Sequence, residues 1–328
     1  YVCIISIFLD KKFQAASVAA LLVICVCSEA IMCDSNTVSI SVKKDSFVSG
    51  YDEFQNVKER LDTIENDDFY RMELTDLRTR MDPSWLNYNG VSVFSSMASE
   101  SVSKLQHNLG MMGNTINSYT YNPQTPVYNM MFSLKYIVNN TTPDLLASSP
   151  NYKQVYSHKN YTAYKNNYCL PIAYLVDSNV ENWANEEYIG NWEKNTLADP
   201  FALQGDYFNL ATGGLGSPFN RLYPAYIDYS NIAPFTEGIT ETAFGFYKTN
   251  TSYDGAAIFT LIPETDSNVY IYFDVTDSNS RSITVTSSLG TMAHSVDQSC
   301  ILDLGYHNAN ETITVNLPLE ASSGTIKF

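Results

Sequence analysis

Four acidic residues are the group best suited by type to carry chemistry: Glu181, Glu186, Glu187 and Asp206. A glycosidase needs two carboxyl groups about 5 to 10 Å apart, one of which acts as the acid. This cluster could supply such a pair, so a secreted glycoside hydrolase is one hypothesis. The preferred alternative is that these are solvated side chains, because an acidic chain brings carboxylates near one another by chance.

Other catalytic and cofactor motifs are absent or incomplete in the sequence. The chain has no G-x-S-x-G sequence, and its four histidines lack the spacing of metal ligands: His107, His158, His294 and His307. Gly213, Gly214 and Gly216 follow a predicted helix rather than a strand, so they do not form a phosphate-binding loop. A calcium loop that starts at Asp277 is interrupted by Arg281. We therefore expect no catalytic residue, metal or cofactor in this chain.

Weaker candidates for substrate contacts are Arg71, Glu73, Tyr174 and Asp206. Arg71 and Glu73 share one face of a predicted strand over residues 69–75, where a surface or cross-strand pair is the commoner role. Tyr174 ends a tyrosine-rich region. Tyrosine rings can stack on sugars, although they more often fill or border a β-sheet core.

The portion after residue 33 is acidic and poor in cysteine. The formal net charge is −16, and residues 1–33 contribute nothing to it. An acidic surface repels phosphate backbones, which excludes nucleic acid as a partner. Cys169 and Cys300, the two cysteines of this portion, could pair or could equally be buried free thiols.

The elements that would position these residues begin with an apolar run over residues 13–33. As a helix it is about 31 Å long, close to the thickness of a bilayer core. Lys11 and Lys12 precede it, and positive charge stays on the cytoplasmic side, so the chain after residue 33 should lie outside. A signal peptide, a lipoprotein leader ending before Cys33 and a buried soluble helix are the alternatives. Residues 1–9 resemble the end of a preceding span, which predicts a transmembrane hairpin (1–33) in a fragment of a larger protein.

Residues 34–235 are predicted to form a mixed α+β domain. Alternation predicts a short strand near residues 38–42 and another, bulged or at an edge, over residues 168–176. Helical spacing predicts a helix after Ser49 with one apolar face and another over residues 101–109 that stops at Gly110. Thr125 and Asp199 each precede a proline, the pattern of an N-cap followed by the first helical residue.

Residues 236–328 are predicted to form a β-sandwich, jelly-roll-like and truncated in a strand. Short strands separated by turn clusters recur through this part. In residues 269–275 the apolar side chains Val269, Ile271 and Phe273 alternate with polar or tyrosine side chains, which indicates one face in the core and one in water. The fold class is therefore α+β.

Six segments, taken in order, resemble the YfhO family of bacterial polytopic membrane proteins: the apolar run with Glu29 near its outer end, YRMEL, LNYNGVSVFSSM, PVYNMMFSLKYIV, YKNNYCLPIAYLV and PFALQGDYFNL. The six segments cover residues 28–209. Each match to the family is loose by itself, but six matches in this order are specific. The resemblance implies an integral-membrane glycosyltransferase that takes a sugar from a polyprenyl-phosphate carrier on the outer face. The acceptor would be a cell-envelope polymer such as lipoteichoic acid.

The resemblance also implies that the catalytic carboxylates lie in earlier outer loops, upstream of this chain. Cys169 and Ala173 depart from the family pattern, which puts a substrate role for their strand in question. We expect a multi-pass protein of the bacterial cell membrane whose outer domain assists acceptor binding, with lipid, carrier and glycopolymer as partners. The alternatives are a non-enzymatic glycan- or protein-binding surface module and the glycoside hydrolase.

Overall fold

The computed structural model describes residues 11–40, 43–65, 69–189, 198–234, 245–250, 252–275, 281–296, 298–319 and 325–327. The chain divides into two compact units, Tyr1–Asp52 and Glu53–Phe328. The predicted end of a preceding span and the calcium-like loop at Asp277 lie outside the described residues.

The first unit contains the predicted membrane helix, α2 (Lys11–Ile40), followed by α3 (Lys44–Val48). Among the described residues, this apolar region supplies the one helix long and apolar enough to cross a bilayer. Its large side chains are exposed, including Leu22 (57%), Ile24 (59%) and Val26 (62%). Such a surface is unfavourable in water and suits lipid, which covers the apolar side chains.

The strand predicted near residues 38–42 is wrong, because α2 continues through Ile40. Polar side chains in this stretch bond the helix backbone: Thr37 Oγ1 donates to the Cys33 carbonyl at 2.8 Å, and Ser39 Oγ to that of Asn36 at 2.7 Å. These bonds let Ser and Thr remain in a helix. The alternation of Val and Ile with Ser was therefore not a strand signal.

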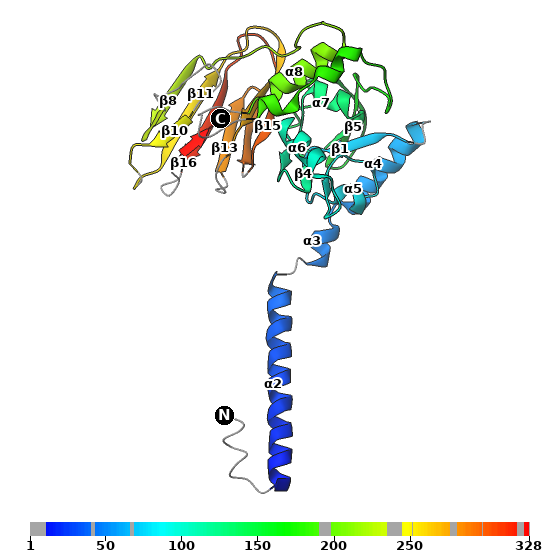
Figure 1. Ribbon diagram of the computed structural model, residues 1–328, viewed down its shortest axis with the longest axis vertical. Coiled ribbons are helices and arrows are strands. Elements are labelled where there is room, and N and C mark those ends of the chain that lie inside the picture. The colour runs from blue at the N-terminus through cyan, green and yellow to red at the C-terminus, as the bar shows by residue number, and fades with distance from the viewer. Residues whose placement is uncertain are drawn as a thin grey trace. The chain divides into compact units, whose positions relative to one another are not determined.

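The second unit begins with helices packed on a small sheet (Figure 1). α4 (Tyr51–Ile64) buries Phe54, Val57 and Leu61 completely, as helical spacing predicted, whereas Ile64 is 38% exposed. The other helices here are α5 (Asp82–Trp85), α6 (Glu100–Asn108), α7 (Pro126–Met131) and α8 (Pro200–Ala211), with 3-10 helices η1 (Ser178–Asn182) and η2 (Asn185–Tyr188). α6 ends before Gly110, whose φ of +91° is the left-handed conformation that favours glycine.

Both predicted cap-and-proline starts are confirmed. Thr125 Oγ1 accepts from the Tyr128 N–H at 3.2 Å at the start of α7, and Asp199 Oδ1 accepts from the Ala202 N–H at 2.9 Å at the start of α8. Each oxygen satisfies one of the donors that a helix leaves free at its first turn.

The main sheet of this part has the strand order β1-β5-β7-β6. Its strands are β1 (Arg71–Leu74), β5 (Leu134–Asn139), β6 (Tyr152–His158) and β7 (Tyr161–Asn166). β1 and β5 are parallel, and the other pairs are antiparallel. A smaller sheet joins β2 (Val93–Phe94), β4 (Ser118–Thr120) and β3 (Met112–Gly113).

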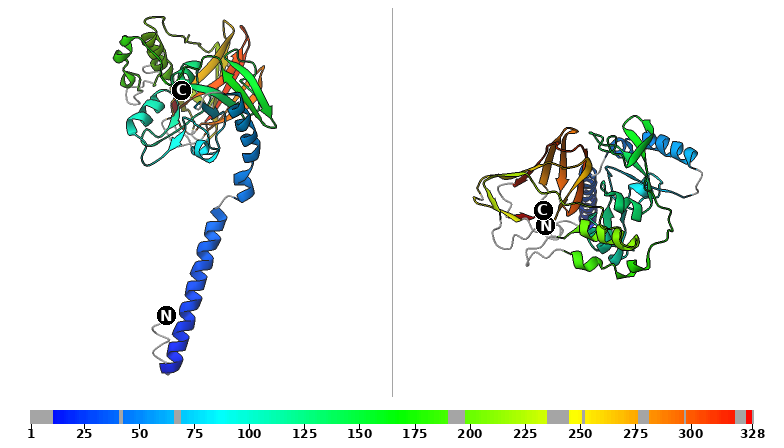
Figure 2. Two further views of the ribbon diagram at one scale, coloured as in Figure 1. Left: turned by 90° about the vertical axis from the view of Figure 1, so that its right-hand side faces the viewer. Right: turned by 90° about the horizontal axis from the view of Figure 1, so that it is seen from above.

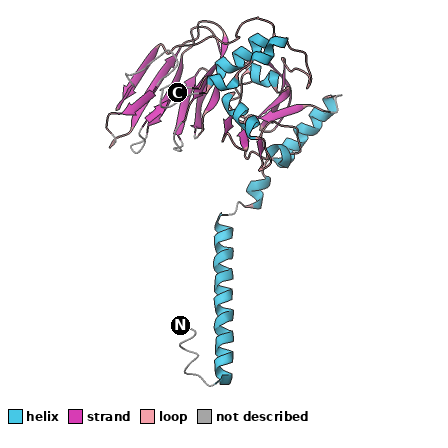
Figure 3. Cartoon of the chain, viewed as in Figure 1, coloured by secondary structure: helices cyan, strands magenta, loops and turns pink. Residues whose placement is uncertain are grey.

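The later part of the second unit is built from strands (Figure 3). One sheet has the order β14-β13-β16-β11-β8, with β8 (Tyr226–Ser230), β11 (Gly255–Leu261), β13 (Arg281–Ser287), β14 (Gly290–Val296) and β16 (Ile313–Leu319). The remaining strands are β9 (Ile232–Pro234), β10 (Gly245–Lys248) and β17 (Thr325–Lys327) in one sheet, and β12 (Ser267–Phe273) with β15 (Cys300–His307) in another. A single apolar core joins Phe259 and Val315 of the first sheet to Phe273 and Leu304 of the β12–β15 pair. The α+β class with a sandwich-like part is therefore confirmed.

The β12–β15 pair is covered on both faces, which differs from the predicted contact with water. Tyr272 of β12 is only 8% exposed although it was predicted to face solvent. The Ile301 N–H donates to the Gly110 carbonyl at 2.9 Å, and Asn268 Oδ1 accepts from Ser149 Oγ at 2.9 Å. Strands of the sandwich and the helical part therefore lie side by side here, as two further views also show (Figure 2).

The strand predicted over residues 168–176 is wrong. No strand is assigned from Asn167 to Asp177, all of which the structure describes. Pro171 and Ile172 are exposed, and only Tyr174 and residues 169–170 are half-buried. The segment is an apolar loop after β7, which hydrophobicity alone could not distinguish from a strand.

Candidate functional site

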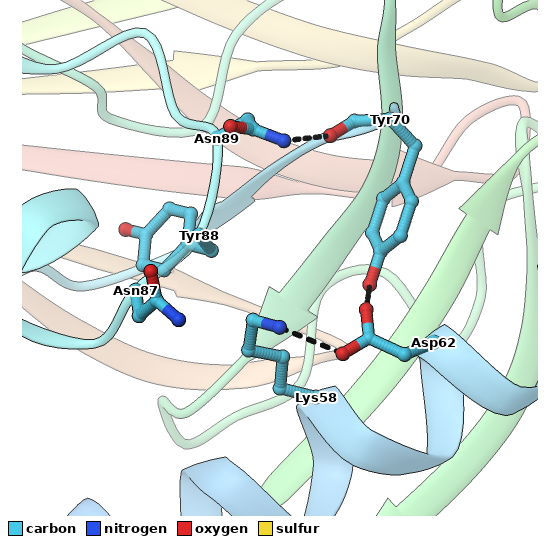
Figure 4. Close-up of a pocket in the computed structure, with 6 residues that line it drawn as sticks. All are labelled: Lys58, Asp62, Tyr70, Asn87, Tyr88 and Asn89. Carbon is cyan, nitrogen blue, oxygen red and sulfur yellow. Dashed lines mark hydrogen bonds and ion pairs between the residues drawn. The ribbon is translucent and has the colours of Figure 1, made fainter. Parts of the chain in front are cut away.

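Two pockets of the second unit meet at Tyr70, the residue that precedes β1. The first has a volume of about 240 Å³ (Figure 4). It is lined by two side chains of α4, by Tyr70 and by the turn that follows α5: Lys58, Asp62, Tyr70, Asn87, Tyr88 and Asn89. Lys58 and Asp62 share one face of the helix because they are one turn apart.

The polar groups of this first pocket hold one another in place. Asp62 accepts from Lys58 Nζ at 2.7 Å and from the Tyr70 hydroxyl at 2.5 Å, and Asn89 Nδ2 donates to the Tyr70 carbonyl at 3.1 Å. Burial, and then the hydrogen bond to Asp62, raise the pKa of Tyr70, so its hydroxyl stays protonated. An ammonium, a carboxylate, amides and two tyrosines are groups that can bind the hydroxyls and the ring faces of a polyol or sugar.

The second pocket, of about 320 Å³, is rich in cations. Arg71 of β1, Lys135 of β5 and Lys165 of β7 line it, together with Asn166 and Asn167. Its apolar wall is formed by Phe69 and by the loop after β7. In register, Lys165 lies opposite Lys153 of β6, a like-charge pair that an anion would stabilise.

One buried carboxylate organises the lysines of this second pocket. Glu65, at the end of α4, forms a close ion pair with Lys135 and a looser one with Lys165 at 3.8 Å. Burial acts to raise the pKa of Glu65, but hydrogen bonds from Lys135 and Tyr136 outweigh it, so the pKa is lowered and the group stays ionised. Two lysines thus share one carboxylate, and Arg71 adds a third cation to the lining of the same pocket.

Arg71 is the candidate that the structure places in a pocket. Its Nη1 donates to the Phe132 carbonyl at 2.9 Å, and its guanidinium carbon lies 5.9 Å from the centre of the Phe69 ring. These contacts fix the guanidinium as a planar donor for phosphate or carboxylate.

Glu73 was expected at the surface or in a cross-strand pair, and that interpretation is wrong. Its side chain is 0% exposed and accepts from the Val91 and Ser92 N–H groups at 2.5 and 2.8 Å and from the Tyr88 hydroxyl at 3.1 Å. The turn over residues 88–92 covers it, because the Met72 N–H donates to the Asn89 carbonyl at 3.0 Å. Glu73 therefore holds that turn, and with it the wall of the first pocket.

Tyr174 lies against α8, which carries Asp206, and neither residue is among those that line the two pockets. The Tyr174 hydroxyl lies 2.7 Å from that of Tyr207, and Asp206 is hydrogen-bonded to Tyr188, whose pKa is raised by burial and then by this carboxylate. Their substrate role remains a prediction.

The acidic cluster gives no carboxylate pair that the structure identifies as a glycosidase centre. Glu181 lies in η1 and Glu187 in η2, both exposed, and the side chain of Glu186 lies outside the described part. Among the described residues, no three His, Cys, Asp or Glu side chains gather as a metal site. Cys169 and Cys300 are both free thiols.

Sequence reasoning missed Tyr70, Lys135 and Lys165 as site residues. Lys58 and Asp62 were recognisable as a helical pair from their spacing. The lysines come from two strands and meet only through the β5–β7 register, in which Tyr136 lies opposite Lys165. A pattern along the chain could not show that meeting.

The comparisons with known proteins give a family and distant structural likenesses. No curated protein matches the sequence. One similar solved structure is a family 35 carbohydrate binding module from Clostridium thermocellum, with 10% identity and a TM-score of 0.24, over 33% of this chain and 91% of that chain. Another is an exo-beta-1,3-galactanase from Phanerochaete chrysosporium, with 13% identity and a TM-score of 0.24, over 34% of this chain and 30% of that chain. A third is tailspike protein 4 of bacteriophage CBA120, with 10% identity and a TM-score of 0.21, over 32% of this chain and 17% of that chain. We draw nothing from likenesses this weak. The family described as bacterial membrane protein YfhO matches residues 1–327, so the chain belongs to the YfhO family of bacterial membrane proteins.

Proposed function

We propose that this chain binds the acceptor for a membrane glycosyltransferase that moves a sugar from a polyprenyl-phosphate carrier to an anionic cell-envelope polymer, such as lipoteichoic acid. The membrane family and the apolar α2 support a bilayer location. In this proposal the protein is multi-pass, the residues after 33 lie outside the cell, and the transfer chemistry is carried out by other parts of the enzyme.

The observation that carries the proposal is the meeting of two unlike pockets at Tyr70. One offers amides, a carboxylate and tyrosines, which suit hydroxyl groups, and the other offers Arg71, Lys135 and Lys165, which suit phosphate. A polymer that alternates polyol or sugar units with phosphodiesters presents both chemistries along one chain. A neutral glycan would present only the first of these two chemistries.

Because the protein as a whole is acidic, a polyanion should bind it only where cations are concentrated, as in the second pocket. At a net charge of −16, the chain as a whole repels polyanions. Binding of a phosphate polymer must therefore depend on the local cations of the second pocket. The interaction should weaken as salt screens it, within a Debye length of about 8 Å at physiological ionic strength.

The test uses the full chain in detergent, titrated with soluble poly(glycerol phosphate), and the variant Lys165→Gln. Lys165 is the best site because its side chain is 45% exposed and its ion pair with Glu65 is the looser one, at 3.8 Å, so the fold should survive. A hydrogen bond to a charged group contributes about 1.5 to 3 kcal/mol, which corresponds to a loss of about ten-fold or more in affinity.

Lys104→Gln is the matched control, since Lys104 is 56% exposed on α6 and lines neither pocket. Its affinity for poly(glycerol phosphate) should equal that of the unchanged chain. Equal affinity for the Lys165 and Lys104 variants would overturn the proposal. Equal affinity for dextran and for poly(glycerol phosphate) would instead favour a neutral-glycan-binding surface module.

A further inference from the structure

The loop after β7, Cys169 to Val176, presents apolar side chains to solvent; we call it the apolar loop. Leu175 is 101% exposed, Ile172 59% and Val176 39%. Pro171 and Ala173 are exposed as well. Isolated apolar side chains are ordinary on a surface, but a continuous run of them indicates an interaction site.

This loop is held in place by several hydrogen bonds. Ser133 Oγ donates to the Pro171 carbonyl at 3.1 Å, the hydroxyls of Tyr174 and Tyr207 lie 2.7 Å apart, and the Asp177 N–H donates to the Ala211 carbonyl at 2.9 Å. The anchored residues Pro171, Tyr174 and Asp177 recur at every third position, and exposed apolar residues lie between them. The apolar side chains are thus displayed by a tethered backbone rather than left over from a poorly packed one.

The loop after α8, which lies near the end of the apolar loop, also has an exposed apolar side chain, Leu215. Asp177 lies against Gly213, where a Cβ would be 3.1 Å from its Oδ2. Leu215, two residues farther along, is 76% exposed. The loop after α8 therefore approaches the end of the apolar loop at Gly213 and carries an exposed apolar side chain of its own.

Cations precede the apolar loop, in a chain with a net charge of −16. Lys153 and Lys165 come before it, Lys159 is paired with Glu53 and Lys165 more loosely with Glu65, and Asp177 follows it directly. The loop also forms a wall of the pocket that holds Arg71 and Lys135. An apolar segment flanked by cations is the pattern of protein segments that enter the interface of anionic bilayers.

We propose that the apolar loop inserts into the surface of an anionic lipid leaflet, with Leu175 and Ile172 among the acyl chains and the neighbouring lysines at the headgroups. Lipid is the occupant that the charges favour, and α2 keeps the chain attached to a bilayer. The inference goes beyond polymer binding and does not depend on it.

The test reads the depth of single tryptophans in the full chain, reconstituted in nanodiscs of phosphatidylcholine with phosphatidylglycerol. Leu175→Trp reports on the loop. Met97→Trp is the control, because Met97 is 91% exposed and precedes α6, outside the apolar loop. The emission of the unchanged chain, which has three tryptophans, is subtracted.

Replacing the lipids by brominated ones should quench the Leu175→Trp emission at least two-fold more than the Met97→Trp emission. Adding Lys153→Gln and Lys165→Gln to the Leu175→Trp variant should reduce that quenching. Equal quenching of the two reporters would overturn the proposal. A blue-shifted Leu175→Trp emission without quenching would also overturn it, because it would show a protein occupant.

The polymer titration in detergent contains no bilayer, so failure of either proposal leaves the other open to its own test. Urea unfolding of each variant identifies any that fails to fold. Leu175→Trp should retain the unfolding midpoint of the unchanged chain, because the side chain that it replaces makes no buried contact.

Discussion

Replacing the buried carboxylate of Glu73 by an amide should remove a pH-dependent loss of stability. Glu73 is 0% exposed, and the Val91 N–H, the Ser92 N–H and hydroxyl, and the Tyr88 hydroxyl donate to it. Burial is the largest effect and raises the pKa of Glu73 to about 7 against those donors, from an ordinary value of 4.5. In Glu73→Gln, the amide oxygen keeps its three donors, and the Tyr88 hydroxyl can reverse to accept from the amide nitrogen.

The sign of this pH dependence follows from the number of protons that the folded and unfolded states bind. Below pH 4.5 the group is protonated in both the folded and the unfolded chain, and above pH 7 it is ionised in both. Between these values the folded state binds more protons, so the free energy of unfolding falls as pH rises. At about 1.4 kcal/mol for each unit of pKa, the whole window amounts to about 3 kcal/mol.

The assay is urea unfolding of the full chain in detergent at pH 5 and pH 8, followed by intrinsic fluorescence. Relative to the unchanged chain, Glu73→Gln should gain about 2 to 3 kcal/mol between pH 5 and pH 8, because pH 5 already lies inside the window. Asp303, whose pKa burial raises to about 6, is present in both proteins and cancels in this difference. Glu100→Gln, at an exposed site, is the control and should show no gain. A Glu73→Gln difference that is flat with pH would refute the reasoning, since it would show that the donors outweigh burial.

Two further substitutions test local geometry by the same unfolding assay. Gly110→Ala should cost about 2 to 4 kcal/mol, because φ is +91° and the new Cβ would lie 2.5 Å from Cδ1 of Ile301; an unchanged midpoint would show that the turn adapts. Thr125→Ala should lower the free energy of unfolding by about 2 kcal/mol and Asp199→Ala by about 1 kcal/mol. The loss is larger at Thr125 because its hydroxyl also donates to the buried amide oxygen of Gln204. Equal losses would show that this second bond adds nothing.

Features governed by neighbours in sequence were the ones that could be predicted. The caps at Thr125 and Asp199 depend on a side chain and an N–H three residues away, and both were confirmed. The apolar face of α4 depends on spacing alone, and Phe54, Val57 and Leu61 are all buried. Short-range geometry is written into a few consecutive residues, so it needs no knowledge of the tertiary fold.

The errors concern residues whose environment is set by distant segments. Glu73 was predicted to lie on the polar face of a strand, because nothing near it in the sequence shows that residues 88–92 cover that face. The apolar loop was predicted to be a strand because a hydrophobic run usually indicates burial, whereas Leu175 is fully exposed. Lys135 and Lys165 were unremarked because strand register, not spacing, brings them to one carboxylate.

The β12–β15 pair bears on the domain boundary predicted near residue 236, which stays a prediction. One face of the pair contributes Phe273 and Leu304 to the sandwich core, while its backbone at Ile301 bonds Gly110 and Asn122 of the helical part. These polar groups are buried only when joined, and each would cost about 1 to 3 kcal/mol if separated without a new partner. β8, which precedes residue 236, also pairs with β11 inside the sandwich sheet. We therefore propose that residue 236 marks a change from mixed to all-strand architecture within one cooperative unit, so that the sandwich stabilises the helical part that carries both pockets.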